Sequence, residues 1–156
     1  MFEKGDLVTY GCKGVCEVKN ITTLNLEGIP KDRLYYEMQS MVNAGSRIFS
    51  PVGQEEKNAM RAVLTDVYKI QAEELLGQLP ECRLCWEKDE RRREETYRRI
   101  INHSDARGML CMIRTITDYG RERVLEGRRM PAMDGRYLKA AEDNLYAELS
   151  IAMEIP

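Results

Sequence analysis

The sequence predicts two small domains, an all-β domain that forms a bent sheet or open barrel and an all-α domain that forms a helical bundle. Short runs rich in β-branched residues, separated by glycine-containing turns, fill residues 1–52. After Pro51, apolar residues recur at helical spacing through residues 53–156. The length of 156 residues and the hydrophobic content of 43% allow two small domains with packed cores.

Four strands are predicted in the N-terminal domain, each bounded by residues that turn the chain. They cover residues 6–10, 15–22, 34–41 and 46–50. Gly11 and Gly14 separate the first two strands, and Gly28 and Pro30 lie in the turn before the third. Short strands with such turns are typical of a strongly bent sheet.

Helical periodicity and end signals predict the elements of the C-terminal domain. Helices are expected at residues 55–64, 72–79, 86–102, about 105–126 and about 131–153. Ser104 or Asp105 caps the fourth of these helices, and Gly127 ends it. Pro131 begins the last helix, which has one apolar face.

Composition excludes several function classes. With 26 acidic and 24 basic residues, the chain is not a uniformly basic nucleic-acid coat. No run approaches the roughly 18 apolar residues of a membrane span, and the charged N-terminus is not a signal peptide, so we expect a cytoplasmic protein without membrane contact. No phosphate loop, nucleophile elbow or zinc-protease motif is present, so we expect no enzyme activity, no small-molecule substrate and no cofactor.

Basic residues are concentrated in the middle of the C-terminal domain. Residues 81–136 carry 14 bases and 11 acids, and 13 of the bases are arginines, whose planar guanidinium suits phosphate. The alternative is a solvated helix face in which acids pair with bases four residues later. These pairs are Glu87–Arg91, Asp89–Arg93, Glu94–Arg98 and Glu95–Arg99. Charge alone favours the solvated face.

Trp86 is the only tryptophan, and it begins an expected helix that has few other apolar residues. Two interpretations of this side chain are open. Either the ring packs down on residues 80–85, or it projects beside Lys88, Arg91 and Arg92. A projecting flat ring among cations suits stacking on bases or wedging between them.

The five cysteines allow a metal, redox or packing role. Cys82 and Cys85 have the spacing of zinc ligands or of a redox pair, and Cys12 and Cys16 supply the remaining ligands of a four-sulfur zinc site. Structural disulfides are rare in a reducing cytosol, so small buried cysteines are the favoured interpretation. The single His103 is expected to be a cap or a surface residue at a helix end.

The N-terminal residues carry the pattern Phe2-x-x-Gly5-Asp6-x-Val8-x-Tyr10, followed by Gly14-Val15 and a turn with Gly28. This pattern, with a helical remainder that contains one tryptophan, resembles the CarD/CdnL family of bacterial transcription regulators. The resemblance implies a Tudor-like domain that docks on the β subunit of bacterial RNA polymerase by strand addition, followed by a helical DNA-binding domain. Transcription-repair coupling factor shares the N-terminal module but is excluded, because no motor motifs follow.

The resemblance also implies DNA contacts in the helical domain. Trp86 matches a wedge that enters the minor groove of promoter DNA at the upstream edge of the transcription bubble, with little dependence on base sequence. Lys88, Arg91 and Arg92 are expected to hold phosphates, whereas Asp89 occupies a position that is often basic in the family.

The polymerase contacts implied by the resemblance lie in the N-terminal domain. They are Leu24 in a turn and the strand residues Arg47, Ile48 and Phe49. Some relatives have basic residues at the positions that match Leu24 and Phe49, so the docking is expected to have altered chemistry here.

Three hypotheses follow from the sequence. A transcription factor that bridges RNA polymerase and promoter DNA predicts an exposed Trp86 and an accessible edge strand within residues 34–50. An adaptor that binds polymerase without DNA predicts a buried Trp86 and arginines paired with glutamates. A small zinc or redox protein would use Cys82 and Cys85. We favour the first hypothesis, which associates the protein with the nucleoid through RNA polymerase.

Overall fold

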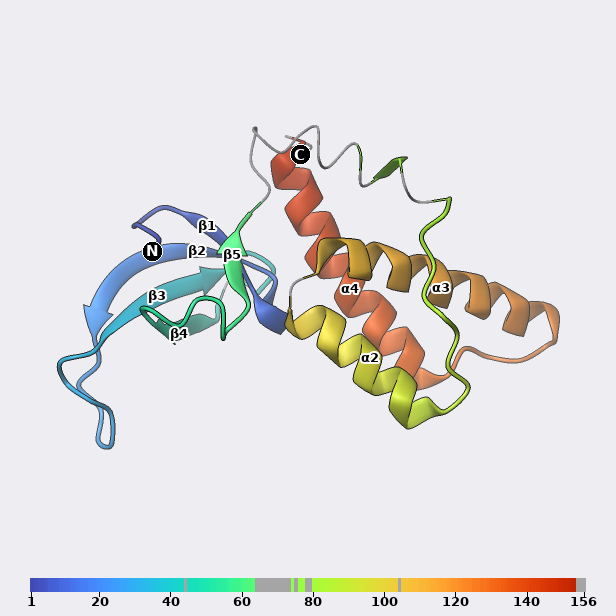
Figure 1. Cartoon of the computed structure of the whole chain (residues 1–156), viewed down its shortest axis with the longest axis horizontal. Helices are drawn as coiled ribbons and strands as arrows, with labels where there is room; N and C mark the ends of the chain where they lie inside the picture. The colour runs from blue at the N-terminus through green and yellow to red at the C-terminus, as the bar shows by residue number, and fades with distance from the viewer. Residues whose placement is uncertain (44, 64–73, 75, 78–79, 104, 154–156) are drawn as a thin grey trace.

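The computed structural model describes residues 1–153, except residues 44, 64–73, 75, 78, 79 and 104. A bent antiparallel sheet forms one side of the molecule and three long helices form the other (Figure 1). The predicted fold class, an all-β domain followed by an all-α domain, is confirmed. No helix within the described ranges is long and apolar enough to cross a membrane.

Five strands form the sheet in the order β4-β3-β2-β1-β5. They are β1 (Leu7–Tyr10), β2 (Val15–Thr23), β3 (Leu34–Ser40), β4 (Arg47–Pro51) and β5 (Met60–Ala62). The first four confirm the predicted strands, with ends that differ by at most one residue. Along β3, Tyr36 and Met38 are fully buried and Glu37 between them is not, because successive side chains face opposite sides of a sheet. The core on this face contains Val8, Cys16, Val18, Tyr36, Met38 and Met60.

The helix predicted at residues 55–64 is wrong, because this part of the chain turns and adds β5 to the sheet. β5 pairs antiparallel with β1, the first strand in the sequence. The turn is held by the Tyr36 hydroxyl, which donates a hydrogen bond of 2.6 Å to Glu55 Oε1. Met60 then enters the sheet core with 5% of its surface exposed. Pairing with the β1 edge outweighs local helix propensity, and the sheet therefore continues past the predicted boundary at residue 52.

The C-terminal domain contains α2 (Glu90–Asn102), α3 (Ala106–Leu125) and α4 (Ala132–Ala152). The predicted end signals of the last two helices are confirmed. The Asp105 carboxylate caps α3 by accepting an amide hydrogen bond of 2.9 Å. Gly127 follows α3 with a φ of 70°, and the amide of Arg128 donates to the carbonyl of Arg123 across the last turn. Pro131 directly precedes α4.

Two other helix predictions have different outcomes. The helix expected at residues 72–79 lies largely outside the described residues. The helix expected at 86–102 begins at Glu90, so Trp86 lies before the helix and does not open it. Asp89 is the N-cap, because its carboxylate accepts a hydrogen bond of 3.0 Å from the amide of Arg92.

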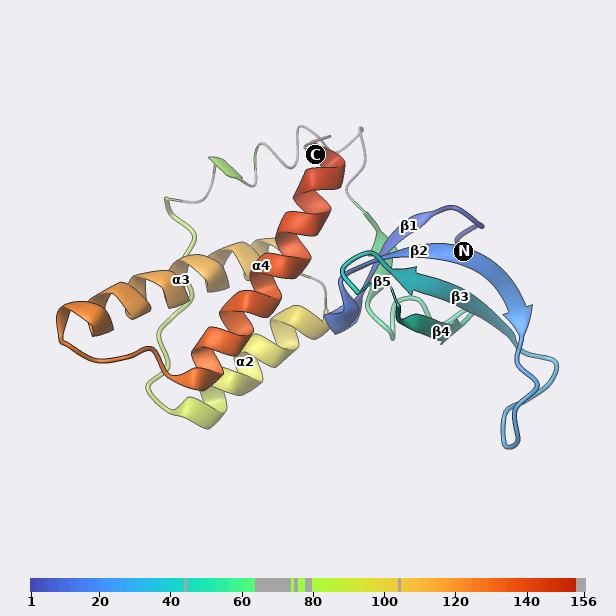
Figure 2. The ribbon, with the colours of Figure 1, turned by 180° about the vertical axis from the view of Figure 1, so that it is seen from behind.

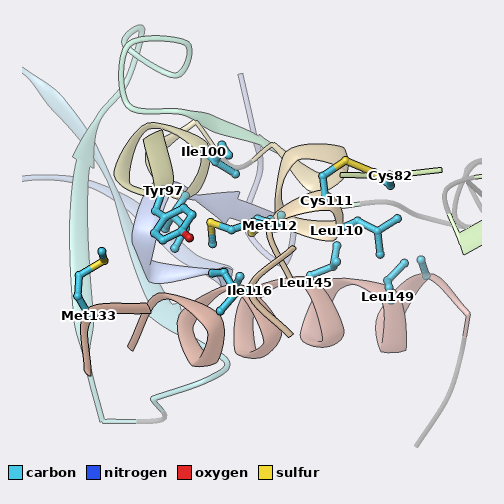
Figure 3. Close-up of a cluster of buried hydrophobic side chains, with 14 residues drawn as sticks. Cys82, Tyr97, Ile100, Leu110, Cys111, Met112, Ile116, Met133, Leu145 and Leu149 are labelled. Atoms are coloured by element: carbon cyan, nitrogen blue, oxygen red, sulfur yellow. A yellow bond between two sulfur atoms is a disulfide. The ribbon is translucent and has the colours of Figure 1, made fainter. Parts of the chain in front are cut away.

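The three helices enclose one apolar core. Figure 3 shows side chains from α2, α3 and α4 pointing toward one another, with a disulfide between Cys82 and Cys111 at one end. Tyr97 from α2, Met112 from α3 and Leu145 from α4 are each 2% exposed or less. This packing fixes the faces that the helices present to solvent.

An ion pair joins the two domains. Arg61 of β5 donates two hydrogen bonds, of 2.5 and 2.9 Å, to the two carboxylate oxygens of Glu148 on α4. The Glu148 side chain is completely buried, whereas that of Arg61 is 34% exposed. A short 3-10 turn, η1 (Gly11–Lys13), also meets the C-terminal end of α2 (Figure 2).

Gly14 forms a second close contact between the domains, and its replacement should be destabilising. Its φ of 68° is strained for any residue with a side chain, and an added Cβ would lie 2.5 Å from Asn144 Oδ1 on α4. Gly14→Ala is expected to lower the free energy of unfolding by about 1–3 kcal/mol in urea titrations. Gly28→Ala is the control, because Gly28 has a similar φ of 85° and no atom within 4 Å of the added Cβ. Equal losses in the two variants would exclude a contribution from the Asn144 contact.

Candidate functional site

The residues before α2 run alongside α3 and are tied to it at successive turns. We call residues 82–86 the Trp86 segment. The Cys82–Cys111 disulfide joins its first residue to α3. Two residues later, the amide of Leu84 donates a hydrogen bond of 2.9 Å to Thr115 Oγ1, one turn further along α3. The segment therefore follows the helix axis without itself being helical.

Trp86 lies at the other end of this segment, stacked on α3. The ring centroids of Trp86 and Tyr119 are 4.1 Å apart, with an interplanar angle of 35°. Arg83, on the same segment, forms a salt bridge of 3.0 Å with Asp118. These contacts lie one turn beyond Thr115, so the tryptophan is held by a regular series of contacts along one helix.

A buried arginine on α2 fixes Trp86 from another direction. The Arg93 guanidinium carbon lies 4.7 Å from the centroid of the Trp86 ring, a cation–π distance. Its Nε and Nη2 each donate a 2.8 Å hydrogen bond to the Asp134 carboxylate at the start of α4. Its Nη1 donates to the carbonyl of Glu87, next to Trp86, at 3.0 Å. Arg93 therefore connects α2, α4 and the Trp86 segment.

Burial and the charge of Asp134 shift the pKa values of the two side chains hydrogen-bonded to it, Arg93 and Tyr97. The hydrogen bonds and charge of Asp134 raise the pKa of Arg93, which stays protonated. The Tyr97 hydroxyl donates a third hydrogen bond to the Asp134 carboxylate, at 3.0 Å. Burial, followed by the charge of Asp134, raises the pKa of Tyr97, so it remains a neutral donor. The predicted Asp89–Arg93 pair is wrong, because Arg93 points into the core toward Asp134 and Asp89 caps α2.

The bridging hypothesis predicts an exposed Trp86 and the adaptor hypothesis a buried one, and the structure gives an intermediate exposure. The ring packs against Tyr119 and Arg93. Trp86 also lines a surface hollow of about 250 Å³, together with Thr115 and Glu122. The structure thus presents a half-buried aromatic ring that is held rigidly at the surface.

The predicted phosphate-binding residues surround the start of α2. Lys88, Arg91 and Arg92 are all exposed, and the described residues contain no salt-bridge partner for any of them. Asp89 is in the same turn, where the amide of Arg92 lowers the pKa of its carboxyl group. Its charge serves the helix N-terminus, where a carboxylate is favourable.

Of the acid–base pairs expected along α2, only Glu94–Arg98 forms among the described residues, at 3.3 Å. The interpretation of this helix as a face of fully paired arginines is therefore wrong. Sequence reasoning missed Arg93, although a signal was present. Arg93, Tyr97 and Ile100 follow one another at i, i+4 and i+7, which is the buried stripe of α2.

The predicted polymerase-binding residues lie mainly on an edge of the sheet. β4 pairs with β3 on one side and ends the strand order, so its other side is an edge. Arg47 is exposed and forms a 3.3 Å salt bridge with Glu37, and Phe49 is 40% exposed. Ile48 points inward and packs against the sheet core, because it alternates with these two side chains.

Leu24 lies half-buried in the connection between β2 and β3, not in the edge strand. Two neighbouring leucines, Leu26 and Leu34, are 58% and 49% exposed. These leucines were not predicted as contact residues.

The cysteine predictions require correction. The pairing of Cys82 with Cys85, as zinc ligands or as a redox pair, is wrong because the sulfur of Cys82 is bonded to Cys111. Cys85 is exposed and free. No group of three or more metal-binding side chains occurs in the part of the chain that the structure describes. The prediction of small buried cysteines holds for Cys16, where burial raises the pKa of the thiol to about 11.

His103 has the predicted structural role. It is the C-cap of α2, and its Nδ1 lies 2.8 Å from the carbonyl oxygen of Arg99. The side chain is exposed.

The bent sheet with an accessible edge strand, joined to a helical domain with a surface aromatic, has the architecture of a two-domain interaction protein. Residues 2–64 match the family model of the CarD-like/TRCF RID domain. This is the Tudor-like RNA polymerase-interacting domain, so the resemblance predicted from the sequence is confirmed for the sheet. The match includes β5, in agreement with the observed extent of the sheet. No curated protein matches the chain.

The match to this domain supports RNA polymerase as a partner and a transcription factor that acts through it.

Proposed function

We propose that this protein binds the β subunit of bacterial RNA polymerase through β4 and stabilises the open promoter complex by inserting Trp86 at the upstream edge of the melted DNA. It acts without catalysis, in the bacterial cytoplasm, with the polymerase on the nucleoid. The observation that carries this proposal is the arrangement of Trp86, which is held rigidly and partly exposed beside exposed Lys88, Arg91 and Arg92.

Rigidity is what a wedge requires. DNA strands that reanneal exert their stacking energy on the inserted side chain, so a ring on a mobile loop would be displaced. Trp86 is supported by the Tyr119 ring and by the Arg93 guanidinium, which is itself fixed by two hydrogen bonds to Asp134. Aromatic side chains that partly unstack a base step act in this way in minor-groove proteins.

The exposed bases near Trp86 suit contacts with the DNA backbone. Lys88, Arg91 and Arg92 lie within one helical turn of one another at the start of α2, which is itself capped by Asp89. These contacts position the protein on DNA but carry no base specificity. With a net charge of −2, the chain depends on its attachment to polymerase for most of its local concentration at the promoter.

The edge of β4 supports the polymerase contact. β4 ends the sheet in the part of the chain that the structure describes, so its outer edge suits the addition of a partner strand, and Phe49 and Arg47 supply side-chain contacts. Phe49→Asp is expected to weaken polymerase binding, because it replaces an exposed apolar side chain on the edge strand with a charged one.

Trp86→Ala tests the DNA contact. It should leave the affinity for RNA polymerase unchanged and reduce the open-complex lifetime to the value measured without the protein. A wedge that opposes ~1–2 kcal/mol of restacking prolongs that lifetime about tenfold. The measurement is the decay of heparin-challenged open complexes formed by the cognate holoenzyme. Tyr146→Ala is the matched control, because Tyr146 is an aromatic residue on α4 that is 52% exposed.

An adaptor that binds polymerase without touching DNA is the second candidate function. The stacking of Trp86 on Tyr119 is also what a ring with a structural role would show, so it is compatible with this function. An unchanged open-complex lifetime in the presence of polymerase-bound wild-type protein would support the adaptor. Equal loss of polymerase binding and promoter effect in Trp86→Ala would also show that Trp86 is structural.

A further inference from the structure

The disulfide in the helical domain encloses the residues proposed to contact DNA. Cys82 and Cys111 are separated by 29 residues, and the closed loop contains Trp86, all of α2 and the exposed bases at its start. Cys82 lies four residues before Trp86, at the end of the Trp86 segment that is bonded to α3. The disulfide is thus the covalent member of the series of contacts that seat the tryptophan.

We propose that this disulfide is a redox-modification site, reduced by a dithiol, and that its oxidation state controls how firmly the Trp86 segment is held on α3. Arg93 of α2 also contacts the Trp86 ring and the carbonyl of Glu87, but the remaining contacts of the segment with α3 are individually weak. They are the Leu84–Thr115 hydrogen bond of 2.9 Å, the Arg83–Asp118 ion pair, in which Arg83 is 58% exposed, and the Trp86–Tyr119 stack. Without the disulfide, each of these contacts stabilises the position of the segment on α3 only weakly.

The chemistry is a two-electron thiol–disulfide exchange. One thiolate of the dithiol attacks a sulfur of the Cys82–Cys111 bond, and the other cysteine leaves as a thiolate. The second thiolate of the reductant then closes its own disulfide and releases the first cysteine. The protein gains two electrons and two protons, and the dithiol is oxidised to a cyclic disulfide. No other reactant is required.

Access to the bond limits this reaction. Cys82 and Cys111 are only 5% and 9% exposed, so reduction requires the Trp86 segment to open. Opening and reduction therefore promote each other, since the reduced segment no longer has its covalent anchor. The free and exposed Cys85 lies between Cys82 and Trp86 and is removed in the test, so that only one disulfide is available there.

The test compares oxidised and dithiothreitol-reduced protein in a Cys85→Ser background. Reduction should raise the hydrogen-exchange rate of the Leu84 amide, which donates to Thr115, at least about 30-fold, because cross-links of this kind restrict the open state. Acrylamide quenching of Trp86, the only tryptophan, should rise in parallel. Cys12→Ser is the matched control, since Cys12 is exposed and free, and it should change neither measurement.

A second variant separates reduction from other effects of the reagent. Cys82→Ser/Cys111→Ser should show fast exchange at Leu84 with or without dithiothreitol, and far-UV circular dichroism reports whether it folds. If that variant does not fold, the comparison of the oxidised and reduced forms of the Cys85→Ser protein decides alone. Equal exchange rates in the two forms, or complete alkylation of all cysteines before reduction, would overturn the proposal.

These measurements need no polymerase, so their outcome is independent of the proposed function. A further expectation rests on that function. If Trp86 is the wedge, reduction should shorten the open-complex lifetime in the wild-type protein but not in Trp86→Ala. A reduction-dependent change in exchange without a change in lifetime would support the redox site and contradict the wedge.

Discussion

Asp134→Ala should lower the free energy of unfolding by about 3–5 kcal/mol, since it leaves the buried Arg93 guanidinium without its counter-ion. Arg93 is 6% exposed, and two of its hydrogen bonds go to Asp134. The variant also leaves the Tyr97 hydroxyl without its acceptor. A buried cation with no partner is far more costly than the loss of a neutral hydrogen bond.

Urea denaturation followed by circular dichroism measures this loss. Asp143→Ala on the same helix is the control, because Asp143 pairs with Lys139 at i, i+4 on the surface and its removal should cost about 0.5 kcal/mol or less. Trp86 fluorescence should shift in Asp134→Ala and not in the control, since Arg93 lies over the Trp86 ring. A loss of less than about 1 kcal/mol in Asp134→Ala would show that water solvates Arg93 there.

The second large effect is expected at the ion pair between the domains. Arg61→Ala removes two charge-assisted hydrogen bonds from Glu148, a carboxylate with no exposed surface. Because Arg61 is itself one-third exposed, water replaces part of the interaction, and we expect a loss of about 2–4 kcal/mol. The domains should also become less firmly oriented, which small-angle X-ray scattering would detect as a larger radius of gyration.

Arg114→Ala is the matched control for Arg61→Ala. Its side chain is 33% exposed, close to the 34% of Arg61, but it pairs with Asp118 within α3. An ion pair along one helix contributes about 0.3–0.5 kcal/mol. If both variants lost the same stability and the scattering did not change, the Arg61–Glu148 pair would not hold the domains together.

The elements that were predicted correctly are those with local signals. β1–β4 follow from alternating side chains between glycine-containing turns, and the ends of α3 from Asp105 and Gly127. β5 was missed because its partner is β1, about fifty residues earlier, while its own residues favour a helix. The start of α2 was predicted at Trp86. The helix begins after Asp89, whose side chain has the properties of an N-cap.

The candidate site was only partly predictable, because its supporting contacts join residues that are far apart in the sequence. The exposed bases around Trp86 were found from sequence, whereas its supports, Tyr119 and Arg93, were not. Asp89 lies four residues before Arg93, so the sequence predicts a local ion pair. The actual partner is Asp134, which is 41 residues away. No spacing rule connects Cys82 to Cys111, because a disulfide depends on how the chain folds.

The position of β5 determines where the chain can be cut to give an N-terminal fragment that folds by itself. Among the described residues β5 is the last strand in chain order, but it covers the edge of β1, the first strand. A fragment that ends at residue 52, the boundary suggested by the sequence, would expose that edge and remove Met60 from the core. Exposed edges pair with other chains and cause aggregation. A soluble, isolated polymerase-binding fragment must therefore extend beyond Ala62, the last residue of β5.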